Sequence, residues 1–320
     1  MKKLFRAAAL GAFLLLAAGP AAAQYPAKPV RILIPYLAGG PVDTTARTIQ
    51  QALSRALGQP IIIENKPGAD GAIAAQAVAS AAPDGYTLFF GGSSTMVSVP
   101  VLRKQPPFDP VADFTPISLI GRFAFCMFVH PGVPAQSVAE FVAHARANPD
   151  KLNFATSNLT EFMFAAQLMK STGISMVRVP YKGAAQAIPD LIAGRVQLDF
   201  VPISAGLAQA RDGRLRMLAI VLPKRLPVAP EVPTMAEAGI PGVTVSPWQG
   251  IFGPAKLPKE IVERLARELN LILQNAEVRA QYDKQGFQPE PSTPEALAAR
   301  LKSDVQTWGQ IVREAGIPQD

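Results

Sequence analysis

The chain has 320 residues, of which 49% are hydrophobic and 17% are charged, and its formal net charge is +7. Its single cysteine excludes an intrachain disulfide, and one cysteine with two histidines argues against a dedicated transition-metal site. The mild, scattered positive charge argues against nucleic acid as a partner, and the length suits one large or two medium-sized domains.

The first 23 residues have the three parts of a secretory signal peptide. The basic residues come first: Lys2, Lys3 and Arg6. An apolar stretch at 7–19 follows, and three small residues at 21–23 supply a cleavage site after Ala23. The apolar stretch is shorter than a membrane span, which favours cleavage over anchoring. Because no later apolar run could span a bilayer, the sequence predicts a soluble protein exported to a bacterial periplasm.

Short apolar runs alternate with amphipathic segments after residue 28. Strands are predicted at 30–36, 60–66 and 87–92, and helices at 44–57 and 71–82. Alternation of this kind predicts a doubly wound parallel sheet with helices on its faces.

The alternation restarts after residues 113–122, which read as a connection. A second set of strands is predicted at 125–130, 151–157, 176–181, 196–202 and 215–222. Helices are predicted from Ser137, from about Thr160, and from Gly183 to about Ala193. Ser137 and Glu140 have the spacing of a capping box. The sequence therefore predicts a second α/β unit of similar build.

The C-terminal part is helical. Residues 258–274 form an amphipathic pattern, and Thr293 with Pro294 is a cap and first-turn pair for a last helix. These helices have few strands of their own to cover, so we expect them to pack on the first unit. The chain would then cross between two lobes near 120–123 and 244–247. The predicted lobes are 24–122 with 246–320, and 123–245.

Motifs for catalysis are missing from the sequence. The stretch "GGPVDT" lacks the lysine of a phosphate-binding loop, and there is no G-x-S-x-G elbow. His130 has no nucleophile spaced to use it, and His144 fits a helix surface. Cys126 lies in an apolar strand, where a thiol is expected to be inert. The sequence predicts no catalytic residue, no metal and no cofactor.

Three polar loops of small residues follow predicted strands, at 37–44, 91–96 and 155–161. Ligands bind at the carboxyl ends of strands in open α/β sheets, where helix N-termini offer free N–H groups. Neutral hydroxyl and amide groups in these loops suit a carboxylate, although each loop is also explained by ordinary caps and turns. Asp43 would repel an anion, so we expect it to cap a helix that begins near Thr44, with contact to a ligand amine or hydroxyl as the alternative.

The chain resembles the solute-binding proteins of tripartite tricarboxylate transporters, the Bug family, from Tyr25 to Ile317. Matching stretches occur in the family's order: "YPAKPVRILIPYLAGGPVDTTAR", "LGQPIIIENKPGADG", "AAPDGYTL", "KLNFATS", "VPYKGAAQAIPDLIAGRVQL" and "LPKRLPVAPEVPTMAEAGIPG". The resemblance implies a two-lobed α/β receptor with a cleft, of the periplasmic binding protein type II or Venus flytrap kind. It also implies capture of a small carboxylate and delivery to a two-subunit membrane permease driven by an ion gradient.

The resemblance also implies where the ligand contacts lie. The family's loops correspond to Tyr36–Asp43, Gly91–Thr95, Ala155–Glu161 and Pro180–Gly183. The expected ligand-binding residues are Tyr36, Leu37, Ala38, Gly39, Gly40, Asp43, Gly91, Ser93, Ser94, Thr95, Thr156, Ser157, Asn158, Thr160, Tyr181 and Val201.

The chain departs from the family pattern at three places in the second lobe. The loop at 155–161 is one residue shorter, Val201 stands where the family often has Asp, and Met163 stands where many members have His. All three changes make the far side of the cleft less polar, so we expect a ligand with an apolar or aromatic distal part. We expect a monomer. Two other functions fit the same fold: a sensory receptor that feeds a two-component system and, less well, a secreted carboxylate-processing enzyme.

Overall fold

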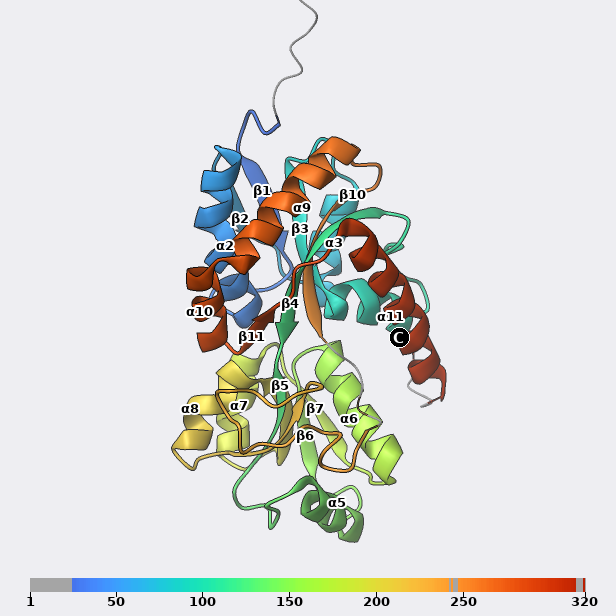
Figure 1. Cartoon of the computed structure of the whole chain (residues 1–320). Helices are drawn as coiled ribbons and strands as arrows, with labels where there is room; N and C mark the ends of the chain where they lie inside the picture. The colour runs from blue at the N-terminus through green and yellow to red at the C-terminus, as the bar shows by residue number, and fades with distance from the viewer. Residues whose placement is uncertain (1–24, 242, 244–246, 315–318, 320) are drawn as a thin grey trace, which may run out of the picture.

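Two separate β-sheets divide the chain into two lobes, stacked end to end (Figure 1). The structure is a computed structural model and describes residues 25–241, 243, 247–314 and 319. The predicted signal peptide at 1–23 lies outside the described residues. Among the helices that the structure describes, none combines the length and the apolar character that a membrane crossing needs.

The first lobe contains a six-stranded mixed sheet in the order β11-β4-β10-β3-β1-β2. Its strands are β1 (Val30–Ile34), β2 (Ile61–Asn65), β3 (Thr87–Gly92), β4 (Phe114–Phe123), β10 (Trp248–Pro254) and β11 (Phe287–Pro289). Strands β1, β2 and β3 are parallel, whereas β10 runs antiparallel to β3 and β4, and β11 runs antiparallel to β4. The predicted parallel sheet is therefore correct for the first three strands and wrong for the other three.

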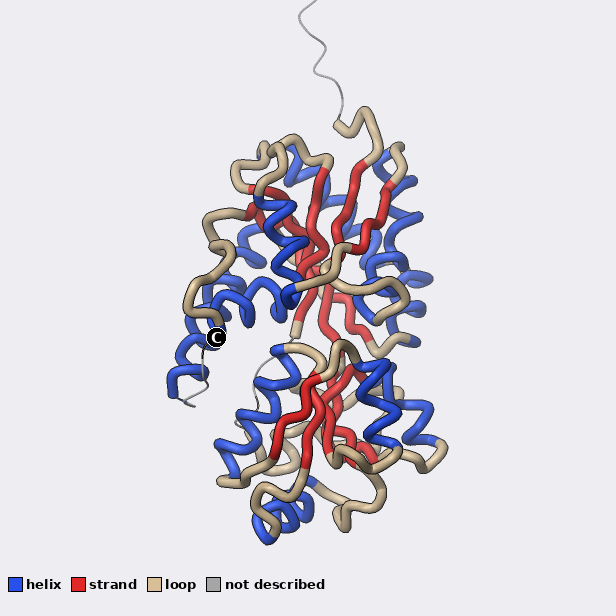
Figure 2. Tube along the Cα trace, turned by 180° about the vertical axis from the view of Figure 1, so that it is seen from behind, coloured by secondary structure: helices blue, strands red, loops and turns tan. Residues whose placement is uncertain are grey.

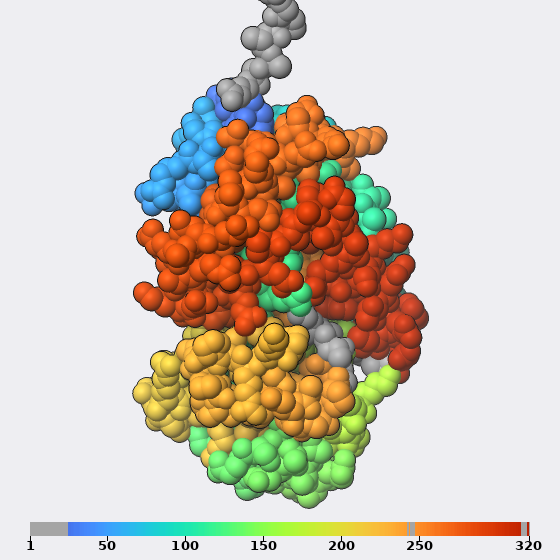
Figure 3. All heavy atoms as spheres, viewed as in Figure 1, coloured from blue at the N-terminus to red at the C-terminus, as the bar shows by residue number. Residues whose placement is uncertain are grey.

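The helices of the first lobe come from both ends of the chain. They are α2 (Pro41–Leu57), α3 (Ala72–Ala79), α4 (Val99–Leu102), α9 (Lys259–Gln274), α10 (Ala276–Lys284) and α11 (Pro294–Glu314), with the short turns η1 (Ala69–Gly71) and η2 (Ser94–Ser98). Helices α9 and α11 pack on β4, and α9 also packs on α2. The expected return of the late helices to the first lobe is confirmed, and Figure 3 shows these segments, coloured orange to red, covering one face of it.

The second lobe contains a five-stranded sheet in the order β7-β6-β8-β5-β9. Its strands are β5 (Phe125–Val129), β6 (Asn153–Thr156), β7 (Val177–Pro180), β8 (Leu198–Pro202) and β9 (Arg216–Val221). Its helices are α5 (Val138–Ala147), α6 (Leu159–Thr172), α7 (Ala184–Ile192) and α8 (Ile203–Arg211). Strand β6 is parallel to β7 and β8, and β5 is antiparallel to β8 and β9. The predicted cap of α5 is confirmed, because Ser137 Oγ accepts a hydrogen bond from Glu140 N at 3.2 Å.

The chain passes between the lobes at the end of β4. Only Ala124 separates β4 of the first sheet from β5 of the second, and its N–H donates to Gly286 O, just before β11, at 3.1 Å. The return path lies between β9 and β10, and the predicted crossing at 244–247 includes residues outside the described ones. We propose that the lobe boundaries lie between residues 122 and 123 and between residues 245 and 246.

Candidate functional site

The carboxyl ends of β1, β3 and β6 lie at the junction of the two lobes. Turn η2, which follows β3, packs against α6, which follows β6 in the other lobe. Figure 2 shows the junction from behind, with loops of both lobes facing each other there. Strand ends in both lobes therefore present their loops to one shared region, as the family resemblance implied.

Tyr36 is the point where the three predicted loops meet. Burial raises the pKa of Tyr36, the hydroxyls of Ser94 and Thr95 lower it, and the charges of Asp70 and Glu161 raise it further. These influences come from η1 after β2, from η2 after β3 and from α6 of the second lobe. The structure thus brings Tyr36, Ser94 and the first turn of α6 together.

Asp43 shapes the first loop from inside helix α2. Its carboxylate accepts hydrogen bonds from Gly39 N, Arg47 Nε and Asn65 Nδ2, each at 2.9 Å. Asn65 Nδ2 also donates to Tyr36 O at 3.0 Å. The expectation that Asp43 is the N-cap is wrong: the helix begins at Pro41 because proline suits a first turn, and the cap position is Gly40. Asp43 instead reaches back to the loop in the way of a capping-box acid.

The ionised form of Asp43 is stabilised by these contacts. Burial opposes ionisation, but the hydrogen bonds from Arg47, Gly39 and Asn65 outweigh it and hold the pKa of Asp43 below its usual value. Since the folded-state pKa is lowered, this stabilisation is present above the unfolded value of about 3.9 and is lost as pH falls through the folded value.

Replacing Asp43 by asparagine should therefore lower the free energy of unfolding by about 1–3 kcal/mol at pH 7, because the ion pair with Arg47 is broken and the loop donors lose a charged acceptor. Urea denaturation measures this loss, which should shrink at pH 3. Glu64→Gln is the control, since the Glu64–Arg31 pair is exposed and should contribute less than about 1 kcal/mol. Equal losses in the two variants would contradict this role for Asp43.

The tip of the first loop is open. Leu37 is 68% exposed, and Ala38 and Gly39 are exposed beside it. Gly39 has φ +80°, a left-handed conformation that glycine adopts without strain. The loop therefore exposes backbone groups and one apolar side chain.

The second loop keeps only one of its three hydroxyls free. Ser93 Oγ accepts from Trp248 N at 3.3 Å, and Thr95 Oγ1 donates to Asp70 O at 3.1 Å. Ser94 Oγ is buried, and the only described group it acts on is the Tyr36 hydroxyl. Gly91 lies within β3 itself and is buried.

Most polar side chains of the third loop also already make hydrogen bonds within the protein. Thr156 Oγ1 accepts from Arg178 Nε at 2.9 Å, Ser157 Oγ donates to Glu161 Oε2 at 2.7 Å, and Asn158 Nδ2 donates to Glu161 Oε1 at 2.8 Å. Asn158 is the N-cap of α6. Thr160 Oγ1, by contrast, is buried without a hydrogen-bond partner in the part of the chain that the structure describes. The predicted set of free donors thus reduces to Ser94 and Thr160.

Two predicted contacts lie in the body of the second lobe. Tyr181 donates its hydroxyl to Asp190 Oδ2 at 2.8 Å, and burial with this contact raises the pKa of Tyr181 to about 12. Val201 is fully buried in an apolar cluster with Cys126 and Leu191. Neither residue has a polar side-chain group free for a ligand.

Two carboxyl groups near the third loop were missed by sequence reasoning. Glu161 is 2% exposed and Asp199, in β8, is fully buried. The spacing of Asn158 and Glu161, a capping-box pattern, was a signal that could have found Glu161. Asp199 stands between Leu198 and Phe200 in an apolar strand and carries no comparable motif.

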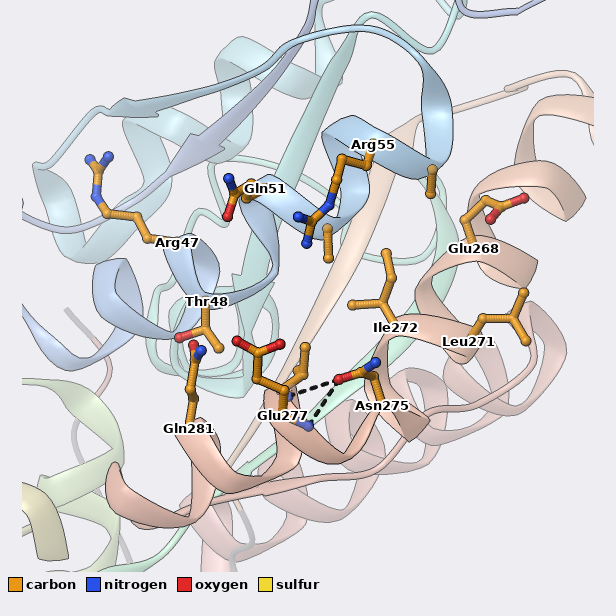
Figure 4. Close-up of a pocket in the computed structure, with 13 residues that line it drawn as sticks. Arg47, Thr48, Gln51, Arg55, Glu268, Leu271, Ile272, Asn275, Glu277 and Gln281 are labelled. Carbon is orange, nitrogen blue, oxygen red and sulfur yellow. Dashed lines mark hydrogen bonds between the residues drawn. The ribbon is translucent and has the colours of Figure 1, made fainter.

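A surface groove lies elsewhere, on the outer side of the first lobe between α2, α9 and α10 (Figure 4). Arg47, Arg55, Glu268 and Glu277 give it mixed charge. It contains none of the predicted ligand-binding residues. Within the described residues, no three His, Cys, Asp or Glu side chains gather in a way that could hold a metal ion.

Comparison with known proteins finds relatives that match most of this chain. Residues 45–317 match the family described as "Tripartite tricarboxylate transporter family receptor". The protein BugT of Bordetella pertussis is 34% identical over 315 residues, covering 97% of both chains. The Rhodopseudomonas palustris protein Rpa4515, solved with adipate, is 31% identical with TM-score 0.86, covering 92% of this chain and 99% of that one. MatC from the same organism, solved with malate, is 32% identical with TM-score 0.82, covering 90% and 100%.

Proposed function

Because the chain belongs to the tripartite tricarboxylate transporter receptor family, we propose that it captures a small carboxylate between its lobes and delivers it to a two-subunit membrane permease. The proposal is supported by relatives of the same fold that bind adipate and malate. Receptors of this kind bind and release their solute without converting it.

One observation supports the position of the ligand most directly. Ser94 in the first lobe and Thr160 in the second are buried hydroxyls, Thr160 without a partner and Ser94 beside only the Tyr36 hydroxyl, on two elements that pack against each other. A buried hydroxyl without a hydrogen bond costs free energy, and a carboxylate oxygen is an acceptor that both can use. Free N–H groups and the positive dipole end at the start of α6 add to the attraction for an anion. Closure of the two lobes about the crossing strands would bring these groups onto one ligand.

The ligand proposed for this chain has an apolar or aromatic distal part. Leu37 leaves apolar surface at the mouth of the junction, and Phe162 is a partly buried ring in α6. Met163, where many relatives have histidine, adds no polar group. An alkyl or aryl monocarboxylate would place its tail against such surfaces and gain from their burial.

A thermal-shift screen of the mature protein tests whether the ligand is a carboxylate and whether its distal part is apolar. The panel holds alkyl and aryl monocarboxylates together with adipate, malate, citrate and glutamate. A ligand that binds only the folded state raises the melting temperature, so monocarboxylates with apolar tails should give the largest shifts. If only citrate or glutamate raised the melting temperature, the proposal of an apolar or aromatic distal part would be wrong. If no compound of the panel raised it, the proposal of a carboxylate receptor would be wrong.

We propose that the chain works as a monomer in the periplasm after cleavage behind Ala23, and that its role is transport. Mass measurement of the periplasmic protein tests the cleavage site, and sizing chromatography tests the monomer. Uptake of the labelled ligand should be lost when the receptor gene is deleted. Unchanged uptake together with an altered transcriptional response would favour a sensory role.

A further inference from the structure

Two buried carboxyl groups lie directly behind the candidate ligand loop. Glu161, in the first turn of α6, accepts hydrogen bonds from the backbone N–H and the hydroxyl of Ser157 and from Asn158 Nδ2. Asp199 lies in β8 and is fully buried, and neither of its oxygens has a hydrogen-bond partner among the described residues. The charges of the two groups influence each other, so they are close in space.

The surroundings of the two carboxyl groups differ in how strongly they stabilise the ionised form. Three donors point at Glu161, and hydrogen bonds from donors favour an ionised carboxylate. For Asp199, burial and then the charge of Glu161 raise its pKa well above the usual value, and only the backbone N–H of Phe200 acts in the other direction. Burial raises the pKa of Glu161 to about 7, against the hydrogen bonds from Ser157 and Asn158.

We propose that Glu161 is a positioning residue for the ligand loop, and that its burial makes this role depend on pH. The proposal rests on the function proposed above. The ionised Glu161 holds Ser157 and Asn158 in place, and this conformation presents Thr160 and the free N–H groups of α6 to the first lobe. Protonated Glu161 loses acceptor capacity, so the loop loosens and the ligand is released.

The other charged or titratable groups around the pair come from neighbouring elements. Tyr36, after β1, lies within reach of the charge of Glu161, and Tyr181, after β7, lies within reach of Asp199. Arg178 of β7 donates to Thr156 Oγ1 and lies over the Phe162 ring at 4.5 Å. Both tyrosines have raised pKa values, so neither of them titrates near pH 7.

Glu161→Gln tests the positioning role by calorimetric titration with the best carboxylate of the panel. The variant should bind five- to tenfold more weakly at pH 8, because an amide has one acceptor oxygen where the carboxylate has two. Glu140→Gln is a matched control: Glu140 has the same capping-box place in α5, accepting from Gln136 N at 2.7 Å, and is exposed. It should leave the affinity unchanged. Equal affinity in Glu161→Gln and the wild type would overturn the proposal.

The pH profile separates positioning from a merely structural role. The folded-state pKa of Glu161 is raised, so its protonation favours the folded state, and the free energy of unfolding should rise as pH falls from 8 to 6. Affinity should fall over the same range, so its loss cannot come from unfolding. In Glu161→Gln the titrating group is gone, so the affinity of this variant should not change between pH 8 and 6.

A wild-type affinity that is flat from pH 8 to 6, or a Glu161→Gln affinity that falls over that range as the wild type's does, would overturn the pH dependence. These failures differ from failure of the proposed function, in which the wild type binds no carboxylate of the panel at any pH.

Discussion

The double variant Ser94→Ala/Thr160→Val should bind its carboxylate about a hundredfold more weakly than the wild type, with no loss of stability when free. Each hydroxyl would donate a hydrogen bond to a charged ligand, and such bonds contribute about 1.5–3 kcal/mol. In the free protein Thr160 Oγ1 is buried without a partner, and Ser94 Oγ lies beside only the Tyr36 hydroxyl, which Thr95 also contacts, so removing both hydroxyls should not lower stability. Calorimetry gives the affinity, and urea denaturation gives the free energy of unfolding.

Thr172→Val is the control for this variant. Thr172 lies at the other end of α6 and donates to Leu168 O at 2.7 Å, so its replacement should lower stability slightly and leave affinity unchanged. A double variant that loses stability and keeps its affinity would mean that the two hydroxyls serve the fold and not the ligand.

Gly121→Ala should lower the free energy of unfolding by about 3 kcal/mol or more. Gly121 has φ +157° near the end of β4, and a Cβ there would lie 2.1 Å from the backbone oxygen of Gln288 in β11. A backbone atom cannot move aside as a flexible side chain can, so β11 would have to separate from β4 next to the crossing between the lobes. Urea denaturation measures the effect.

Gly213→Ala is the control for Gly121→Ala. Gly213 has φ +71° with no atom within 4 Å of the added Cβ, so only backbone strain of about 1–2 kcal/mol is expected. Similar losses in the two variants would contradict the close approach of β11 as the cause.

Sequence patterns predicted the parallel strands of the fold and missed its antiparallel core. Strand β4 contains Pro116, and proline is unusual inside a central strand. The structure accommodates Pro116 beside a register shift between Ile251 and Phe252 of the partner strand β10. Strand β10 was itself missed, because its pairing with β3 and β4 depends on residues far away in the sequence.

The sequence predicted which loops form the candidate site, but not which of their polar side chains lack a hydrogen-bond partner. The sequence shows seven Ser, Thr and Asn side chains in the second and third loops, all of them able to donate. The structure shows that Glu161, Asp70 and other neighbours already occupy most of them. Which hydroxyl is occupied depends on tertiary contacts, so residue type and spacing could not separate Ser94 and Thr160 from the rest.

The position of Asp43 also depends on tertiary contacts that the sequence does not show. Sequence reasoning recognised it as a residue that serves the start of a helix, but placed it at the cap. Its three partners include Asn65 at the end of β2, a contact made by the parallel pairing of β1 and β2. Helix boundaries shift by a few residues when proline and glycine allow an earlier start, as Gly40 and Pro41 do here.

A crystal structure with the best carboxylate of the panel tests the central claim most directly. The account predicts the carboxylate between the lobes, with an oxygen within hydrogen-bond distance of Ser94 Oγ or Thr160 Oγ1 and the tail toward Leu37. A carboxylate bound instead in the outer groove between α2, α9 and α10 (Figure 4), with the junction of the lobes unoccupied, would contradict it.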